Sequence, residues 1–399
     1  MRLTIVRQDY RPEGLVERVT ERALEALLER NVAVSLYTRS WPQTRLQLVE
    51  PLVLDPFFVG ALWRDWSFAR AACRDVRRSQ PNLVEAHDRM LCCDIYRASD
   101  GVHAAWVAER LKDSTGVGRL LAILSAHDHY LLAMEKRLYA STWLRAVICN
   151  SRMVKDELRR YYDVPESKLH VIYNPVDAEI FHPGLREERA AILSRHGVAD
   201  DAVVFLVAAP DLARVDVGAA IDAFARQGPT ARLFVLGGGR KAARDITKRA
   251  QSAGAGDRVT FVSGGLDRRP YYGAADVFVT PARYDPSPEV PFEAMACGLP
   301  VIASTKSGAA ELLPSCDAGL VYPAGDVAGL AAHMQALLDP AARARLGGNA
   351  RRAVSSFSPS AITLQQVLLY RDLLATPAPG AAVAVSTADP IHDLPASPR

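Results

Sequence analysis

The chain lacks long apolar runs. None of its 399 residues belongs to a stretch of about 18 or more consecutive apolar residues, so no transmembrane helix is expected. The apolar stretch near the start is interrupted at Arg7 and Gln8, which makes it too short for the core of a signal peptide and predicts a cytoplasmic protein. Hydrophobic residues still make up 49% of the chain, which is enough for packed cores and excludes general disorder.

A surplus of one charge is also missing. The 48 basic residues, of which only seven are lysines, nearly balance 45 acidic residues and leave a net charge of +3. No basic block stands out, which argues against a nucleic-acid partner. Arg74, Arg77 and Arg78 form a small basic cluster that suits a solvated helix face or, as an alternative, peripheral contact with a membrane surface.

The sequence contains no C-x-x-C pair, so zinc-ribbon and dithiol redox sites lack support. His127 and His129 flank an aspartate and could bind a metal, but a solvated helix surface is the preferred interpretation, and no metal site is predicted. In a cytoplasmic chain we expect the cysteines to be small buried hydrophobic residues. They are Cys73, Cys92, Cys93, Cys149, Cys297 and Cys316.

Two series of short apolar strands alternate with helical patterns. After the first strand, apolar residues recur every four positions from Leu15 to Leu27, which predicts a helix before the next strand. Strand, helix and strand in this order predict parallel sheets with crossover helices, and hence an α/β fold. The expected strands are 2–6, 32–37, 83–86, 146–149 and 170–173 in the first series, and 203–208, 232–236, 258–262, 277–279 and 300–303 in the second.

The two series predict two domains, residues 1–178 and 179–357. A helix at 358–375 is expected to return to the first domain, and residues 376–399, with five prolines among alanine and serine, are expected to form a disordered tail. Ligands of open parallel sheets gather at the carboxyl ends of the strands, which predicts a site in the cleft between the domains.

A proline-rich segment holds the strongest candidate site. Asp285 follows the strand at 277–279, and Glu293, which seven residues separate from Asp285, lies early in the next helix. The start of a helix presents free backbone N–H groups and a positive dipole end, which suits an anion or sugar hydroxyls. An acidic cap on an ordinary helix would also explain Glu289, so both interpretations stand at this point.

This segment resembles the signature of glycosyltransferase family 4, in which an acidic residue and a Glu separated by seven positions mark the nucleotide-sugar site. The nearest match is the lipopolysaccharide core α-glucosyltransferase group, and the resemblance covers residues 1–374. The other segments that carry it are 10–18, 99–103, 148–151, 171–177, 271–276, 298–301 and 307–311.

The resemblance implies a GT-B fold, in which two Rossmann-like domains face each other across a cleft. It implies a retaining hexosyltransferase that uses a nucleotide sugar of the UDP-glucose type, without a metal or another cofactor. The acceptor would belong to the lipopolysaccharide core or to another glycan or lipid-linked molecule, which is compatible with peripheral contact at the inner membrane.

The resemblance also implies roles for single residues. A carboxylate accepts two hydrogen bonds from adjacent hydroxyls, so Glu293 would hold the ribose. Asp285, one methylene shorter than the family's usual Glu, would contact the donor sugar in a catalytic role. The donor would also be lined by Ser287, Pro288, Glu289 and Val290.

Three positions depart from the family pattern near the expected diphosphate. Arg214 matches a family arginine and would be catalytic, but Val215 stands where a Lys is expected and Asp216 where a Gly is expected. In the first domain Glu13 precedes Gly14 in place of a Gly-Gly pair, and a carboxylate there would repel the donor. A lost cation would weaken the stabilisation of the leaving group.

The departures leave two hypotheses open. In the first, Lys241 or Arg240, which follow a triple glycine, substitute for the missing cation and the protein is an active transferase. In the second, the chain is a catalytically impaired relative that binds a sugar, a nucleotide or a partner protein. The loose G-x-G-x-x-A pattern at 237–242 lacks an acidic residue after the next strand, so no nicotinamide cofactor is predicted.

The acceptor side of the cleft has fewer candidates. His87, Asp88 and Asp100 follow expected strands and could face an acceptor, and His103 belongs to a segment that carries the resemblance. A purely structural role is the alternative for each of them.

Overall fold

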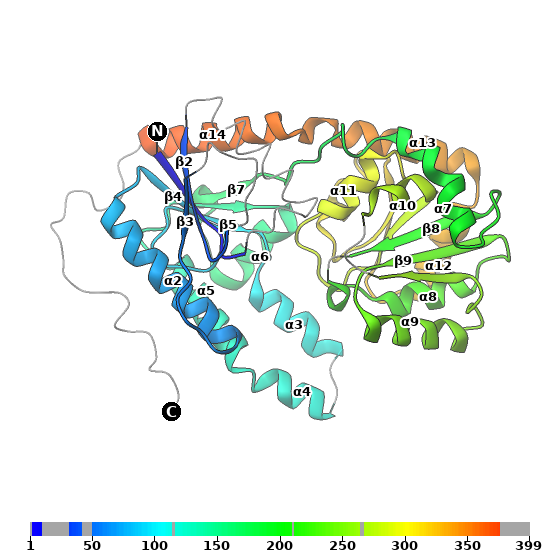
Figure 1. Cartoon of the computed structure of the whole chain (residues 1–399), viewed down its shortest axis with the longest axis horizontal. Helices are drawn as coiled ribbons and strands as arrows, with labels where there is room; N and C mark the ends of the chain where they lie inside the picture. The colour runs from blue at the N-terminus through cyan, green and yellow to red at the C-terminus, as the bar shows by residue number, and fades with distance from the viewer. Residues whose placement is uncertain are drawn as a thin grey trace.

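The computed structural model describes residues 2–9, 32–41, 50–113, 116–209, 211–263 and 267–375. Two parallel sheets with their helices form two lobes that lie side by side along the long axis of the molecule (Figure 1). The predicted helix at 15–27, the departure at Glu13 and Gly14, and the tail at 376–399 lie outside the described residues. None of the described helices is long and apolar enough to cross a bilayer.

The first lobe is built on a seven-stranded sheet in the order β3-β2-β1-β4-β5-β6-β7. All its strand pairs are parallel, and β4, β5 and β6 are buried along their whole length, as expected for a sheet covered by helices on both faces. The strands are β1 (Arg2–Val6), β2 (Ala33–Thr38), β3 (Glu50–Val53), β4 (Leu83–Ala86), β5 (Ile95–Ala98), β6 (Ala146–Cys149) and β7 (Leu169–Val171).

Two of these strands escaped the sequence analysis because polar residues interrupt their apolar pattern. β3 begins with Glu50 and Pro51, and β5 contains Arg97, which is buried and paired with Glu85 of β4. The helices of this lobe are α2 (Gly60–Ser79), α3 (His103–Asp113), α4 (Gly116–Ile123), α5 (Ala126–Tyr139) and α6 (Arg152–Tyr162). Ser151 caps α6, because its side chain accepts a hydrogen bond from the backbone N–H of Val154.

The second lobe is built on a six-stranded parallel sheet in the order β10-β9-β8-β11-β12-β13. Its strands are β8 (Val203–Ala208), β9 (Ala231–Leu236), β10 (Val259–Val262), β11 (Val277–Thr280), β12 (Val301–Ser304) and β13 (Gly319–Tyr322). Its helices are α7 (Arg189–Arg195), α8 (Val217–Ala225), α9 (Arg240–Ser252), α10 (Arg269–Ala274), α11 (Glu289–Ala296), α12 (Val327–Ala336) and α13 (Pro340–Val354). The sequence analysis missed β13, which starts at a glycine whose added Cβ would lie 2.0 Å from the carbonyl oxygen of Val301.

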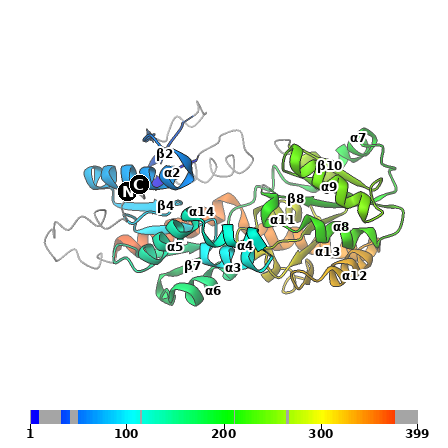
Figure 2. The same ribbon diagram turned by 90° about the horizontal axis from the view of Figure 1, so that it is seen from below.

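The last helix, α14 (Pro359–Ala375), returns to the first lobe and lies along it (Figure 1). Its residues Ile362, Val367 and Tyr370 are buried in one hydrophobic cluster with Leu3 and Ile5 of β1. The chain therefore crosses between the lobes twice, and Figure 2 shows the same two-lobed arrangement from below.

Several contacts hold the lobes together, and three sets of them lie near the carboxyl ends of the strands. Ser151 Oγ donates to the carbonyl of Pro286 over 3.0 Å. Tyr284 Oη accepts from the backbone N–H of Val102 over 2.8 Å, and Glu311 accepts from the first two N–H groups of α6. Both approaches need glycine, since an added Cβ at Gly101 would lie 2.4 Å from Tyr284 Oη and one at Gly308 would lie 2.9 Å from the Cβ of Ser151.

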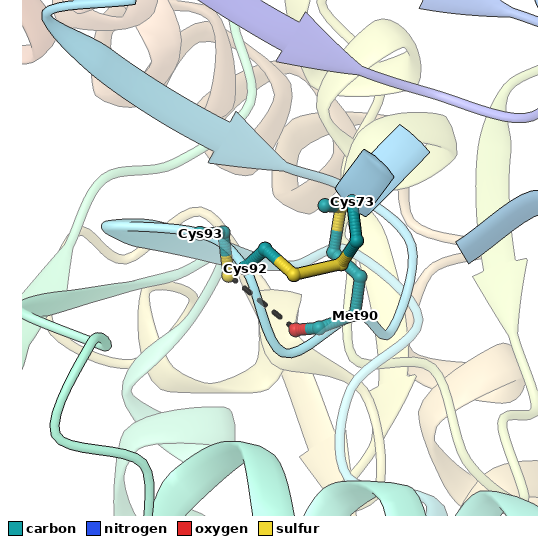
Figure 3. Close-up of a disulfide and its surroundings, with 4 residues drawn as sticks. All are labelled: Cys73, Met90, Cys92 and Cys93. Carbon is teal, nitrogen blue, oxygen red and sulfur yellow. Dashed lines mark hydrogen bonds between the residues drawn. A yellow bond between two sulfur atoms is a disulfide. The ribbon is translucent and has the colours of Figure 1, made fainter. Parts of the chain in front are cut away.

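The cysteines correct one expectation. Cys73 of α2 and Cys92 of the loop between β4 and β5 form a disulfide across 5.5 Å between their Cα atoms, although we expected free thiols (Figure 3). Cys93, Cys149 and Cys297 are free and buried as expected, and Cys316 is exposed. The sequence could not predict the pairing because it depends on the docking of α2 against the β4–β5 loop.

We predict that loss of this disulfide destabilises the fold. The bridge closes a chain segment with a sequence separation of 19 residues, for which the loss of loop entropy in the unfolded chain is about 3 kcal/mol. Cys73→Ser should lower the free energy of unfolding in urea by about this amount without reductant, and dithiothreitol should lower that of the wild type similarly. Cys316→Ser is the control. Equal stability of the wild type with and without reductant would contradict the prediction.

Candidate active site

A cavity of about 460 Å³ opens between the lobes. Its first-lobe wall comes from the ends of β1, β4, β5 and β7 and from the helices α2, α5 and α14, and its second-lobe wall comes from α11. The cavity therefore lies at the carboxyl ends of strands of the first sheet and beside α11, the helix that follows β11. This is the cleft in which the sequence predicts a ligand. The polar residues that line it are Arg7, Gln8, Asp9, Arg64, Asp65, Glu85, His87, Asp88, Arg89, Arg97, Ser99, Asp100, His127, Tyr130, Asn174, Glu289, Glu293, Gln366 and Tyr370.

Glu293 lies on α11 and lines the second-lobe side of the cavity. Its carboxylate accepts hydrogen bonds from Arg268 over 3.0 Å and from the hydroxyl of Tyr272 over 2.6 Å. Burial raises the pKa of Glu293, and the charge of Arg268 and the hydrogen bond from Tyr272 oppose that rise. The carboxylate is therefore held rigidly, and each oxygen keeps a lone pair for a ligand hydroxyl.

Asp285 lies in the loop between β11 and α11 and is only partly exposed. Its side chain accepts a hydrogen bond from Ser307 Oγ over 3.3 Å, and its backbone pairs with the segment 306–308. Burial raises the pKa of Asp285 to about 7, and the nearby charge of Glu289 adds to the rise. Asp285 does not line the cavity itself but stands beside Glu289, which does.

The loop at 285–290 is fixed from the opposite lobe. Asn174, which follows β7, donates its side-chain amide to Ser287 Oγ over 2.7 Å and to Glu289 Oε1. Pro288 and Val290 are buried at the start of α11, so the loop presents its backbone in one conformation. The sequence analysis gave Asn174 no such role, because the partner lies 113 residues away.

The basic residues expected at a diphosphate lie elsewhere. The guanidinium of Arg214 donates to the carbonyl of Asp100 over 3.3 Å and lies over the ring of Trp106, outside the cavity lining. Lys241 is exposed on α9 and also lies outside the lining. Arg240 is exposed beside it.

The two departures at 215 and 216 have structural roles. Val215 is buried, with 8% of its surface exposed, and packs in the core of the second lobe. Asp216 caps α8 by accepting from the N–H of Ala219 over 3.0 Å, and it forms an ion pair with Arg283 over 3.3 Å. The carboxylate of Asp216 is therefore engaged by a helix cap and a guanidinium.

The acceptor-side candidates divide into two groups. His87, Asp88 and Asp100 line the cavity, whereas His103 lies at the start of α3, bonded through Nε2 to Asp128 over 2.9 Å and outside the lining. Burial raises the pKa of Asp88 to about 7, and the charges of Asp100 and Asp65 add to the rise.

A buried charge network lies beneath His87. Glu85 accepts from His87 and from Arg97, each over 3.1 Å, and from the hydroxyl of Tyr370 over 2.6 Å. Burial opposes ionisation of Glu85, but Arg97, His87 and Tyr370 outweigh it and lower its pKa to about 2. The sequence analysis missed this network, although charged residues inside two otherwise apolar strands were its visible signal.

The histidine pair at 127 and 129 needs a correction. We expected a solvated helix surface, yet Asp128 is buried between His103 and Arg110, and His127 lines the cavity in an ion pair with Asp65 over 2.9 Å. Within the described ranges, no group of three or more His, Cys, Asp and Glu side chains is arranged to hold a metal ion.

We predict that Asp285 makes stability depend on pH. Its pKa is about 7 in the folded chain and about 3.8 as the ordinary value, so the folded state holds a proton that the unfolded state has lost between these values. The free energy of unfolding should then fall, as the pH rises through this window, by roughly 1.4 kcal/mol per pH unit from this residue. Asp285→Asn should remove that contribution in urea titrations from pH 4 to 8, whereas exposed Asp257→Asn should not. Parallel curves for the wild type and Asp285→Asn would show that the carboxyl is ionised throughout.

Family models match both lobes. The model described as "Glycosyltransferase Family 4" matches residues 16–180, and the one described as "Glycosyl transferases group 1" matches residues 193–340. Among solved structures, WaaG, a glycosyltransferase involved in lipopolysaccharide biosynthesis, has a TM-score of 0.77 at 19% identity, covering 92% of this chain and 99% of that one. Anabaena Alr3699/HepE in complex with UDP-glucose has a TM-score of 0.69 at 18% identity and covers 93% and 100%.

Whole-length relatives agree with the models. The "Probable transglycosylase" of Burkholderia thailandensis is 30% identical over 365 residues, which is 87% of this chain and 90% of that protein. The alpha-maltose-1-phosphate synthase of Mycobacterium tuberculosis is 29% identical over 425 residues, covering 94% and 100%. With the two facing parallel sheets and the acidic pair at 285 and 293, these matches establish that the chain is a GT-B glycosyltransferase of family 4.

Proposed function

We propose that this enzyme is a retaining hexosyltransferase that uses a donor of the UDP-glucose type and an acceptor hydroxyl of a lipopolysaccharide-core or other lipid-linked glycan. The observation that carries the proposal is the placement of Glu293, a rigid carboxylate at one wall of the cavity between the lobes. The neighbours also support it, since one of them is a structure in complex with UDP-glucose and another is involved in lipopolysaccharide biosynthesis.

The donor's parts are assigned by their chemistry. Glu293 binds the two ribose hydroxyls, because it lines the cavity and each carboxylate oxygen can accept a further hydrogen bond. Asp285 binds hydroxyls of the transferred sugar, next to the backbone of Ser287, Pro288, Glu289 and Val290 at the start of α11. In this division of labour, the nucleoside and the sugar of the donor contact residues 179–357, and residues 1–178 bind the acceptor through His87, Asp88 and Asp100.

The proposed reaction needs no protein base. The acceptor oxygen bonds to the anomeric carbon on the face from which the phosphate departs, so the sugar keeps its configuration. The proton of the acceptor hydroxyl passes to the departing phosphate oxygen, and the nucleoside diphosphate carries away the electron pair of the broken bond. The enzyme contributes by positioning both substrates and by stabilising the charge on the leaving group.

We predict that Glu293→Gln loses most donor turnover. The substitution keeps the shape but replaces one acceptor oxygen by an amide, so the ribose loses a charged hydrogen bond worth roughly 1.5–3 kcal/mol. Release of UDP from UDP-glucose should fall about 10- to 100-fold, with the loss mainly in KM because the ribose does not react. Exposed Glu188→Gln is the matched control. The base of the donor is identified separately, from which of UDP, GDP and ADP raises the melting temperature of the wild type. Undiminished turnover of folded Glu293→Gln would refute the ribose assignment.

An apolar rim beside the cavity supports contact with a membrane. The ion pair of His127 with Asp65 joins the starts of α5 and α2, so the segments before these two helices flank one contact. Large apolar side chains are exposed before these helices and in the first turn of α2: Phe57, Val59 and Trp63 are 75%, 66% and 42% exposed, and Leu120, Ile123 and Leu124 are 55%, 47% and 65% exposed. Exposed apolar side chains next to two helices that line the cavity suit a lipid-linked acceptor that enters from a bilayer.

We predict that Phe57→Ser combined with Leu124→Ser weakens binding to vesicles of anionic lipid about tenfold in co-sedimentation, because both side chains would insert among the acyl chains. Trp143→Ser is the control, since Trp143 is 60% exposed but lies beyond the opposite end of α5. An equal loss in both variants, or none in either, would argue against this docking face.

A further inference from the structure

The structure raises the question of which cation balances the diphosphate of the proposed donor. The lysine position of the family is occupied by buried Val215, Arg214 donates to a backbone carbonyl of the first lobe, and Lys241 lies outside the cavity. A diphosphate carries at least two negative charges, and the charge on the leaving oxygen grows as its bond to the sugar breaks. A cation inside the cavity would therefore assist both binding and reaction.

Four arginines line the cavity, and three of them are already engaged by carboxylates. Arg64 pairs with Asp65 over 3.1 Å, and Arg89 pairs with Glu135 over 2.9 Å. Arg97 pairs with Glu85 over 3.1 Å. The fourth is Arg7, whose side chain forms no hydrogen bond or ion pair within the ranges that the structure describes.

Arg7 is nevertheless held in place. It directly follows β1, its backbone N–H donates to the carbonyl of Tyr37 over 2.9 Å, and the preceding Val6 is fully buried. The guanidinium thus starts from a fixed point at the carboxyl end of β1, an interior strand of the first sheet. A side chain anchored in this way and left without a partner is available to a ligand.

The charge of Arg7 acts on carboxyls of both walls of the cavity, since it opposes the rise that burial causes in the pKa of Asp88 in the first lobe as well as in that of Glu289 in the second. It lowers the pKa of Glu289, against the larger effect of burial, and does so more than any other charge near that carboxyl. Glu289 is the first residue of α11, so the guanidinium and the positive end of that helix approach one region of the cavity from opposite lobes. Glu289 itself is turned toward the amide of Asn174 and the hydroxyl of Ser287.

We infer that Arg7 binds the diphosphate of the donor and stabilises the departing nucleoside diphosphate, in place of the cation that Val215 does not supply. The inference rests on the proposed function and names a further residue for it. An arginine suits this position because its charge is permanent and its planar fork can bind two phosphate oxygens at once. The residue belongs to the first lobe, so a donor bound by Glu293 would bridge the two lobes.

The test separates the phosphates from the nucleoside. Arg7→Ala and Arg7→Lys are titrated with UDP by calorimetry and with uridine by thermal shift, using the nucleotide and nucleoside of whichever base the wild type selects. Arg7→Ala should weaken UDP binding roughly 10- to 100-fold and leave uridine binding unchanged, and Arg7→Lys should recover part of the loss. Turnover of bound donor should fall as well, because the charge grows in the transition state.

Arg2→Ala is the matched control, since Arg2 is exposed at the other end of the same strand. Equal losses for UDP and uridine, no loss for UDP, or a change confined to the KM of the acceptor would each overturn the assignment of Arg7. If the wild type binds no nucleoside diphosphate at all, the proposed function fails with it. If the wild type binds UDP and Arg7→Ala binds it equally well, only the role of Arg7 fails.

Discussion

The position of the candidate site depends on one buried phenol. Tyr284 belongs to the second lobe by sequence, but its ring packs in the hydrophobic core of the first. Its hydroxyl accepts from the N–H of Val102 and donates to Glu157 over 2.7 Å, and the contact is possible because Gly101 has no side chain. Asp285 is the next residue, so the loop that presents the candidate donor site starts from a point fixed inside the opposite lobe.

The two walls of the cavity are therefore not independent. The donor-side loop is held by Asn174 of the first lobe, and the first turn of α6 in the first lobe is capped by Glu311 of the second. A capping carboxylate satisfies N–H groups that would otherwise be unpaired, so separating the lobes would expose them. These contacts stabilise the observed arrangement of the two lobes. They also place first-lobe groups such as Arg7 in the same cavity as α11.

Sequence reasoning was strongest where local pattern determines structure. The parallel strands, the capped start of α6 and the position of Glu293 on a helix after β11 all follow from residues that are neighbours in the chain. It failed where distant residues meet. The pairing of Cys73 with Cys92, the bond from Asn174 to the 285–290 loop and the closure of Glu85 by Tyr370 of α14 each depend on docking that no local pattern encodes. The sequence also could not predict that Arg7 is available to a ligand. That depends on the pairing of the other three cavity arginines with carboxylates in the folded chain.

The departures at 215 and 216 acquire a common explanation from the segment that they contact. The backbone of Arg214 accepts hydrogen bonds from Arg283 and Tyr284, Val215 forms a bridge with Ala282, and the N–H of Asp216 donates to Pro281. This segment therefore supports the loop that carries Tyr284 into the first lobe. A buried valine strengthens such a support, whereas a lysine there would have to leave the core to keep its charge in water. The substitution exchanges a cation at the donor for apolar packing beneath the loop. The charge of the diphosphate must then be balanced by a residue of the other lobe. Arg7 at the end of β1 can do this, because its guanidinium has no partner among the described residues and its backbone is anchored in the first sheet.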